Sequence, residues 1–383
     1  MAPRTPSAAR SKAATAAPAR AGRWLTPPVL VRQIRNGIVE SAHRGDVVEA
    51  DATGRLIRVI GDPDRVTYLR SCGKPFGLLA LLRAGGVEEL DLTTDELAIM
   101  AASHSGEDLH VRTIQALYRR VGIPQAALIC AADPTPMDLV TAARLARDGE
   151  RPSQLRHMCS GQHSALILMA KLGGWELETY WRPEHPAHVA YRQAIADVFD
   201  VPYERLRAGI DGCGIETYAF TLRETARAYA LLADPSAIPE RDHRASLAPQ
   251  LIRIRDAMLL HPDLVAGTRE RLDTSLMKAA PKRIVAKSGM EALQGVAILR
   301  GPRGAVADAP ASGLAIKVED GDGFSRGLSA ATVEALRQAG VLEGQALRVL
   351  ARYHRPPSMD PHGRVTGEAV PDFELAPVGE LIG

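Results

Sequence analysis

The sequence predicts an α+β protein, in which one antiparallel sheet is built from both ends of the chain and helices from the middle cover it. Strand-like segments lie before residue 61 and again after residue 283, whereas the stretch between them carries apolar side chains at helical spacing. Strands and helices do not alternate strictly along the chain, as they would in a parallel sheet. We therefore expect a mainly helical second lobe beside the sheet.

The strands of the N-terminal part are predicted as short runs of β-favouring residues. A turn-like Asp-Ala-Thr-Gly sequence precedes the last of these runs. The four predicted strands are residues 29–33, 37–42, 47–50 and 56–60.

The middle of the chain is predicted to be helical. The clearest helix start is Thr93, because Asp95 and Glu96 follow it where the first turn would lie. Further helices are predicted over residues 107–121, 137–148, 161–172, 186–199, 221–233 and 246–260.

Strands are predicted again towards the C-terminus, separated by turns rich in Gly and Pro. They are residues 283–287, 295–299, 305–307 and 314–318, followed by a helix over residues 329–339. The remaining C-terminal stretch is rich in Pro, so we expect it to be irregular apart from a strand near residues 363–369.

The charge balance gives no sign of a nucleic-acid partner. The 383 residues include 47 Lys and Arg and 45 Asp and Glu, a net charge of +2, and only 4% are aromatic. Five of the basic residues lie within residues 1–23, which hold no acid and are expected to form a disordered tail. An Arg-rich, acid-free start is also typical of organelle transit peptides, although no amphipathic pattern is obvious.

The sequence favours the cytoplasm. No apolar run approaches the roughly 18 residues that span a bilayer, and the N-terminus lacks the apolar core of a secretory signal. Four cysteines in a chain of this length do not form the pattern of a disulfide framework. We therefore expect neither a membrane partner nor structural disulfides.

Ser71 and Lys74 form the first candidate site. A serine hydroxyl needs a base to take its proton before it attacks a substrate. A lysine three positions later lies on the same helix face, and burial lowers a lysine's pKa, so that its neutral amine can act as the base. The same spacing recurs at Ser275 and Lys278, where a surface helix is the favoured interpretation.

Two later segments add to this pair. Ser103 and His104 lie where a predicted helix ends, and Lys287 precedes Ser-Gly at the end of a predicted strand. Gly289 would allow a ligand to approach the sheet edge. Each segment alone is more typical of a turn. Together, the order Ser-x-x-Lys, Ser-x-Ser and Lys-Ser-Gly resembles that of penicillin-binding proteins and serine β-lactamases.

Two cysteines form a separate candidate site. Cys159 opens a predicted helix with His163 close behind it, and Cys213 lies in a predicted tight loop. Thiols and imidazole are ligands that suit zinc. Because the sequence has no Cys-x-x-Cys pair, spacing alone favours the interpretation that both cysteines are small buried apolar residues.

Five segments, in this order along the chain, resemble the asparaginase II family of L-asparaginases, which use serine and lysine. The resemblance runs from about residue 29 to residue 320, and less distinctly to the end of the chain. The segments that carry it are Asn36-Gly37-Ile38-Val39-Glu40-Ser41-x-His43-Arg44-Gly45, Arg70-Ser71-x-x-Lys74-Pro75-Phe76, Ala102-Ser103-His104-Ser105-Gly106-Glu107, Cys159-Ser160-Gly161-x-His163 and Asp211-Gly212-Cys213-Gly214.

The resemblance implies a β-lactamase-like fold, with residues 24–383 as a single two-lobed catalytic domain, and a homodimer. It implies two Ser–Lys pairs in one site, Ser71 with Lys74 and Ser103 with Lys287. The implied reaction is hydrolysis of the side-chain amide of L-asparagine without an organic cofactor. Either serine could attack, and we favour Ser71, which would form an acyl-enzyme.

The expected substrate contacts follow the same resemblance. Asp211 would hold the α-amino group of L-asparagine and Arg70 its α-carboxylate, although an ion pair between structural residues would also explain both. The other residues expected in the substrate site are His104, Gly212, His163 and Gly289.

The resemblance also implies a zinc ion, and the matching ligand positions are Cys159, Gln162 and Cys213. Related proteins have lysine at the position of Gln162. A Gln carbonyl oxygen is a poorer partner for a borderline-soft ion than a neutral amine, so this departure weakens the expected zinc site. His163 is the alternative third ligand.

Three alternatives stay open. The first is another Ser–Lys hydrolase that acts on glutamine, a β-lactam or an ester, because a pocket discriminates one methylene by only about 1–3 kcal/mol. The second is an amino-acid-binding protein that has lost turnover, which the departure at Gln162 supports. The third is a nucleic-acid-binding or scaffold protein that uses the basic tail.

Overall fold

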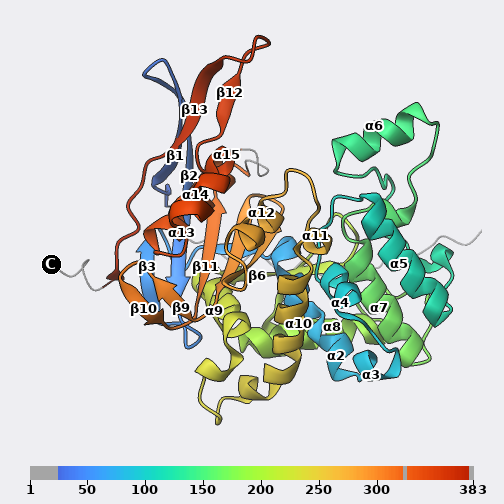
Figure 1. The fold of residues 1–383 in the computed structure, drawn as a ribbon. Coiled ribbons are helices and arrows are strands. Elements are labelled where there is room, and N and C mark those ends of the chain that lie inside the picture. The colour runs from blue at the N-terminus through green and yellow to red at the C-terminus, as the bar shows by residue number, and fades with distance from the viewer. Residues whose placement is uncertain (1–24, 322–325, 379–383) are drawn as a thin grey trace, which may run out of the picture.

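The computed structural model describes residues 25–321 and 326–378, so the tail predicted at residues 1–23 lies outside the described residues. A twisted antiparallel sheet stands on one side of the molecule, and most of the helices gather on the other (Figure 1). The predicted mixed α and β architecture, with an antiparallel sheet from both chain ends, is confirmed.

The described residues place eight strands in the large sheet, in the order β12-β13-β1-β2-β11-β8-β7, with β3 paired to β2. Each pair is antiparallel. The N-terminal and C-terminal strands meet where β2 pairs with β11 and where β1 pairs with β13. The strands are β1 (Val29–Arg35), β2 (Ile38–Ala50), β3 (Leu56–Ile60), β7 (Ile284–Gly289), β8 (Leu293–Ile298), β11 (Ser312–Val318), β12 (Pro357–Met359) and β13 (Val365–Pro371).

Two of the predicted strands, residues 37–42 and 47–50, are one long strand in the structure. The polar residues between them interrupt the apolar pattern but not the backbone pairing, because β2 crosses from an exposed outer half to a buried inner half. Gly45 lies at this point, where an added Cβ would stand 2.3 Å from the carbonyl oxygen of Lys317. A glycine there lets β2 and β11 stay paired.

Most of the smaller elements were not predicted. A three-stranded antiparallel sheet joins β4 (Val66–Tyr68), β6 (Glu216–Thr221) and β5 (Arg207–Ile210). The strand predicted at residues 305–307 is present as β10 (Val306–Ala309), and its partner β9 (Gly301–Arg303) was not predicted. The C-terminal stretch expected to be irregular contains β12 and two short helices. These elements are too short to show a period in the sequence. The two helices are α14 (Gly344–Val349) and α15 (Ala351–His354).

The predicted helices are present, and from α5 onwards their ends differ from the prediction by no more than two residues. Thr93 and Glu96 form the expected capping box at the start of α4. The predicted helices are α4 (Thr94–Met100), α5 (Asp108–Val121), α6 (Leu139–Arg147), α7 (Ser160–Leu172), α8 (Pro186–Phe199), α9 (Leu222–Ala233), α10 (Ala248–Leu260) and α13 (Gly327–Gln338). Shorter helices are α2 (Leu79–Arg83), α3 (Gly86–Glu89), α11 (Pro262–Val265) and α12 (Leu272–Ala279).

Helix α9 connects the sheet to the helical side. It packs on β2, β8 and β11, while α13 packs on β1, β11 and β13. Glycines allow the close approach, because a Cβ on Gly313 would lie 1.9 Å from the Ala226 carbonyl oxygen and one on Gly295 would lie 2.1 Å from the Tyr229 ring. Strands β7, β8 and β11 are buried along their whole length, so the end of β7 lies inside the protein.

One property of the helices bears on the location predicted from the sequence. Among residues 25–321 and 326–378, no helix combines the length and the apolar character needed to cross a membrane.

Candidate active site

Ser71 and Lys74 lie on one short segment between the two sides of the molecule. A 3₁₀ turn (Arg70–Gly73) leads directly into α1 (Lys74–Gly77). Arg70 has a φ of 47°, a left-handed conformation that few residues other than glycine adopt. Its backbone N–H donates to Thr217 Oγ1 at 2.9 Å, and Tyr229 of α9 donates its hydroxyl to the Cys72 carbonyl at 2.9 Å. The segment is therefore held from β6 and from α9.

Lys74 is buried and points towards Ser103. Its Nζ donates to Ser103 Oγ at 2.9 Å and to the Ala102 carbonyl at 2.8 Å, and lies 3.3 Å from Cys159 Sγ. Among the described residues, the Ser71 hydroxyl has no hydrogen-bond partner and lines a small cavity. The structure therefore brings Lys74 against the second serine, while Ser71 faces the cavity.

Ser103 is held by backbone pairing after the end of α4. Its N–H donates to the Val265 carbonyl at 3.1 Å, and the N–H of Ser105 donates to the Ala266 carbonyl at 2.7 Å. Its own carbonyl accepts from Nη2 of Arg271 at 2.9 Å. The hydroxyl is thus fixed between Lys74 on one side and the cavity on the other.

Lys287 lies on β7 and is fully buried. Its Nζ donates to the Ser288 carbonyl at 2.6 Å, and in the part of the chain that the structure describes it has no hydrogen bond to Ser103. The pKa of Lys287 is lowered to about 8, mainly by burial; the charge of Asp273 opposes this shift and that of Lys74 contributes to it. A lysine with this pKa changes its charge near neutral pH.

The end of β7 supports the Ser71 segment. Ser288 donates its hydroxyl to Asp273 Oδ2 at 2.7 Å, and its N–H donates to the same oxygen at 2.9 Å. An added Cβ on Gly289 would lie 2.8 Å from the Leu69 carbonyl oxygen. The close neighbour of Gly289 is therefore the backbone that leads into the Ser71 segment.

The serines meet at the inner end of a cavity. The innermost space is about 10 Å³, no more than about one water, and a larger cavity of about 700 Å³ shares its lining residues Met137, Arg271 and Ser288. Methionine side chains are unbranched and flexible, so we expect them to shift when a substrate enters. The innermost space is lined by Ser71, Ser103, Met137, Met158, Arg271, Ser288 and Met290.

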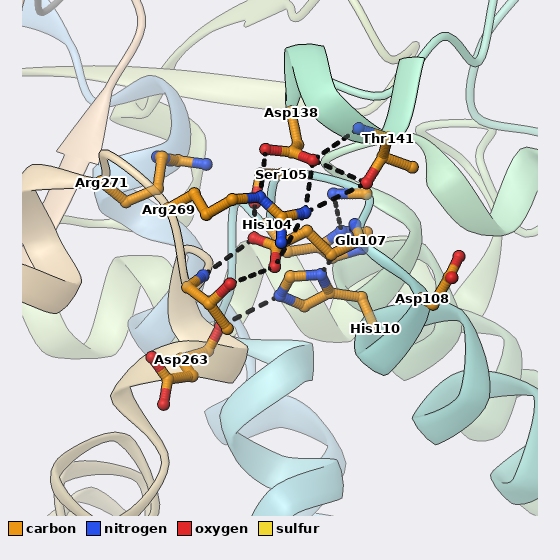
Figure 2. Close-up of polar contacts among 12 residues, drawn as sticks. His104, Ser105, Glu107, Asp108, His110, Asp138, Thr141, Asp263, Arg269 and Arg271 are labelled. Atoms are coloured by element: carbon orange, nitrogen blue, oxygen red, sulfur yellow. Dashed lines mark hydrogen bonds and ion pairs between the residues drawn. The ribbon is translucent and has the colours of Figure 1, made fainter. Parts of the chain in front are cut away.

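The outer part of the cavity is built around ion pairs (Figure 2). Asp138 caps α6 by accepting from the N–H of Thr141 at 2.8 Å, and it accepts from Nε of Arg269 at 2.9 Å. Arg269 also lies 3.4 Å from Glu107, which accepts from the hydroxyl of Ser105 at 2.7 Å. The hydrogen bond from Arg269 lowers the pKa of Asp138 to about 2.

Arg70 and Asp211, both expected to hold the substrate, bind each other. Nε and Nη2 of Arg70 lie 3.0 and 2.7 Å from Asp211 Oδ1. The N–H of Gly212 donates to the same oxygen at 2.6 Å. The hydrogen bond with Asp211 raises the pKa of Arg70. This geometry corresponds to the ion-pair alternative, and the substrate role of the two residues stays a prediction.

His104 and His163 are fully buried and bonded to the protein. His104 Nε2 lies 2.8 Å from Ser160 Oγ while its Nδ1 accepts from the N–H of Gly106 at 3.1 Å. His163 Nδ1 lies 2.6 Å from the Tyr180 hydroxyl. Burial lowers the pKa of His163 to about 3 and that of His104 well below its usual value, so both rings are neutral at pH 7.

At the expected zinc positions the two cysteines are neighbours, whereas the third residue bonds elsewhere, and the zinc site stays a prediction. Cys159 and Cys213 are neighbours, and the hydrogen bond between them lowers the pKa of Cys159 and raises that of Cys213. Gln162 is turned to Tyr191, with its Nε2 donating to the phenol oxygen at 2.9 Å. No cluster of three or more His, Cys, Asp or Glu side chains that could hold a metal exists within residues 25–321 and 326–378, so His163 does not complete the set. Protein zinc sites use three or four such ligands.

Sequence reasoning missed Arg271 and Asp273. Arg271 faces both cavities, and Asp273 holds Ser288 from the first turn of α12. Neither belongs to a motif, because their positions depend on how α12 packs against β7. Ser288 was available as the middle residue of the Lys-Ser-Gly segment.

The family follows from comparison with known sequences. The model of the L-asparaginase II family matches residues 31–371, which is most of the chain. The protein therefore belongs to the L-asparaginase II family, and this membership indicates an amidohydrolase. None of the curated proteins matches the chain.

Solved structures give a distant likeness to Mglu. Mglu in its native form aligns at 17% identity and a TM-score of 0.36, over 79% of this chain and 66% of that chain. Mglu in its L-glutamate binding form in the presence of 4.3 M NaCl aligns at 17% identity and a TM-score of 0.35, over 83% of this chain and 65% of that chain. The alignments thus span less than two thirds of these two relatives.

Proposed function

We propose that the protein is an L-asparaginase that hydrolyses the side-chain amide of L-asparagine through an acyl-enzyme on Ser71. The observation that carries the proposal is that Ser71 and Ser103 line one cavity beside two buried lysines, although the four residues come from three distant segments. Family membership supports an amide as the substrate. The β-lactamase-like fold is part of the same proposal, supported by the antiparallel sheet whose strand β7 ends at the Ser71 segment.

In the first step, Ser71 Oγ attacks the amide carbon and gives its proton to Lys74. Ser103 Oγ, which accepts a hydrogen bond from Lys74, passes a proton on to the amide nitrogen. The carbon–nitrogen bond breaks, ammonia leaves, and an ester joins the aspartyl group to Ser71.

In the second step, water attacks this ester and its proton moves to the lysine network. Lys287 takes part here as the group that changes charge near neutral pH, since its pKa is about 8. The ester bond to Ser71 breaks, the lysine network returns the proton to Ser71 Oγ, and L-aspartate leaves.

The first experiment is ammonia release by the purified full chain from L-asparagine and, separately, from L-glutamine, each with EDTA and with added zinc. We expect release from L-asparagine that is faster than from L-glutamine and changes less than twofold with either addition. Ammonia release from L-glutamine alone would show that L-glutamine, and not L-asparagine, is the substrate. No ammonia release under any of these conditions would refute the proposal.

The nucleophile is tested by Ser71→Ala, with Ser275→Ala as the matched control from the second Ser-x-x-Lys sequence, on α12. We expect Ser71→Ala to lower kcat/KM by a factor of about 10³ or more. Ser275→Ala should leave kcat/KM within about twofold of the wild-type value. Mass spectrometry of acid-quenched enzyme should find the aspartyl adduct on the peptide that contains Ser71. An adduct on the Ser103 peptide would move the attack to that serine.

A further inference from the structure

Two arginines lie close to the serines, and they differ in their partners. Arg70 is bonded to Asp211, as described above. Arg271 has no such partner, since no carboxylate oxygen among the described residues lies within 4.0 Å of its guanidinium. It donates to two backbone carbonyls instead, from Nη1 to Ala266 at 3.0 Å and from Nη2 to Ser103 at 2.9 Å.

Arg271 stands where the two cavities meet. It lines the innermost space together with Ser71 and Ser103, and it also lines the larger cavity. A guanidinium has five N–H donors in a planar fork, so donors remain after the two carbonyl bonds. Burial lowers the pKa of Arg271, and the charges of Asp273 and Glu107 oppose this shift from beyond ion-pair distance. A negatively charged ligand bound to the guanidinium would supply the direct ion pair that neither acid makes.

We propose that Arg271 binds a carboxylate of the substrate and thereby selects amides that carry an acidic group. The proposal rests on the amidohydrolase function given above and names the residue that recognises its substrate class. Arginine binds carboxylates through paired hydrogen bonds that fix both distance and orientation. Because the same guanidinium holds the Ser103 backbone, a carboxylate bound there lies at a fixed position relative to the reacting serines.

The chemistry that suits this place is an amide whose carboxylate lies a few bonds from the scissile carbonyl. L-Asparagine is a small member of this class, and a cavity of about 700 Å³ leaves room for larger ones. Arg70, by contrast, is already neutralised by Asp211 and acts on the backbone that leads into Ser71. The carboxylate contact expected at Arg70 is thereby moved to Arg271.

The test compares two substrates on two proteins. Wild type and Arg271→Gln are assayed for ammonia release from L-asparagine and from 3-aminopropanamide, which is L-asparagine without its carboxylate. We expect Arg271→Gln to lower kcat/KM for L-asparagine about 10- to 100-fold, mainly through KM, the loss of one charge-assisted hydrogen-bond pair. Turnover of 3-aminopropanamide should stay within twofold, so the preference for the carboxylate disappears.

Controls separate recognition from structure. Arg271→Lys keeps the charge without the fork and should recover part of the L-asparagine activity. Arg352, which stacks on Tyr353, places another positive charge in the lining of the larger cavity. Arg352→Gln should leave kcat/KM unchanged for both substrates. Equal losses for both substrates in Arg271→Gln would mean that Arg271 only supports the Ser103 backbone, and would overturn the proposal. So would an unchanged preference for L-asparagine.

A binding measurement keeps this proposal apart from the function it rests on. If wild type releases no ammonia from L-asparagine, the proposed reaction fails, and calorimetry with the product L-aspartate then judges Arg271 alone. Binding to wild type that weakens at least 10-fold in Arg271→Gln would support the carboxylate contact. Equal binding to both proteins, or none to wild type, would overturn it.

Discussion

The two ends of the cavity treat charge in opposite ways. At the outer end, Asp138 and Glu107 share Arg269, and each carboxylate also accepts hydrogen bonds from neighbouring side chains or backbone (Figure 2). At the inner end, Lys74 and Lys287 are buried without a carboxylate oxygen of the described residues within 4.0 Å. Their partners are hydroxyl, thiol and backbone groups.

This difference separates structure from chemistry. Paired charges at the outer end fix the start of α6 and the loop that carries Arg269, but a charge that is fully paired is not free to exchange a proton. Uncompensated buried cations cost stability, and they persist where the surrounding fold holds them. Groups of this kind are candidates for proton transfer, which is the role proposed for the inner end.

The largest effect is expected for Lys74→Met, which removes the side-chain nitrogen that bonds Ser103. Because both proton transfers of the proposed first step pass through Lys74, kcat/KM for L-asparagine should fall about 10²- to 10⁴-fold. Steady-state kinetics measures the loss, and circular dichroism should show an unchanged fold.

The chain supplies a matched control in Lys278→Met. Lys278 has the same Ser-x-x-Lys spacing but is exposed and paired with Asp263 at 2.6 Å. Its replacement should leave kcat/KM within about twofold of the wild-type value. Similar losses of kcat/KM in Lys74→Met and Lys278→Met would show that the effect does not depend on the position of Lys74 at the inner end of the cavity.

The next effect concerns Lys287, whose pKa of about 8 lies well below its usual value of 10.5. If its neutral amine serves the second step, wild-type kcat should rise with pH through about 8. The charged groups that act on it are Asp273, Lys74 and Arg271. In Lys287→Met we expect kcat to fall about 10²-fold and the rise near pH 8 to vanish. A rise near pH 8 that survives in the variant would assign it to another group.

Stability should move in the opposite direction in the same variant. The folded pKa of Lys287 is lower than the unfolded one, so the cost of the buried ammonium is fully present below pH 8 and disappears between pH 8 and 10.5. Lys287→Met should therefore raise the free energy of unfolding at pH 7, by at most about 3 kcal/mol. Urea unfolding at pH 7 and pH 10 measures the difference, which should shrink at the higher pH.

The sequence predicted much of the frame because the long helices repeat apolar residues with a clear period and the strands are runs of β-favouring residues between turns. Helices α5 and α8, for example, begin and end within one residue of the prediction. It did not predict the three-stranded sheet of β4, β6 and β5, because these short strands are stabilised by pairing between distant segments. That sheet holds the Ser71 segment, so the missing strands are part of the site.

The site was predicted as a set of residues but not as a set of contacts. Motif order placed Ser71, Lys74 and Ser103 together, yet spacing along one helix suggested that Lys74 would bond Ser71, whereas its hydrogen bond goes to Ser103. The direction in which the Lys74 side chain points depends on how the short helix α1 packs, and spacing along the sequence does not determine this packing. Arg271 belongs to no motif, and its importance appears only in the structure, where its guanidinium forms no ion pair with a described carboxylate.

The smallest effect is expected at the outer end, where Asp138 both caps α6 and pairs with Arg269. Asp138→Ala removes both contacts and should lower the free energy of unfolding by about 1–2 kcal/mol at pH 7. Asp138→Asn keeps an equally good cap and loses only the ion pair, so the loss should be smaller than about 1 kcal/mol.

The folded pKa of Asp138, about 2, lies below the usual 3.8, so the stability contributed by the ionised carboxylate is present above pH 4 and disappears as pH falls through 2. Both variants should keep kcat/KM for L-asparagine within twofold. A loss of activity as large as that of Lys74→Met would show that the outer ion pairs take part in the chemistry, and the contrast between the two ends of the cavity would fail.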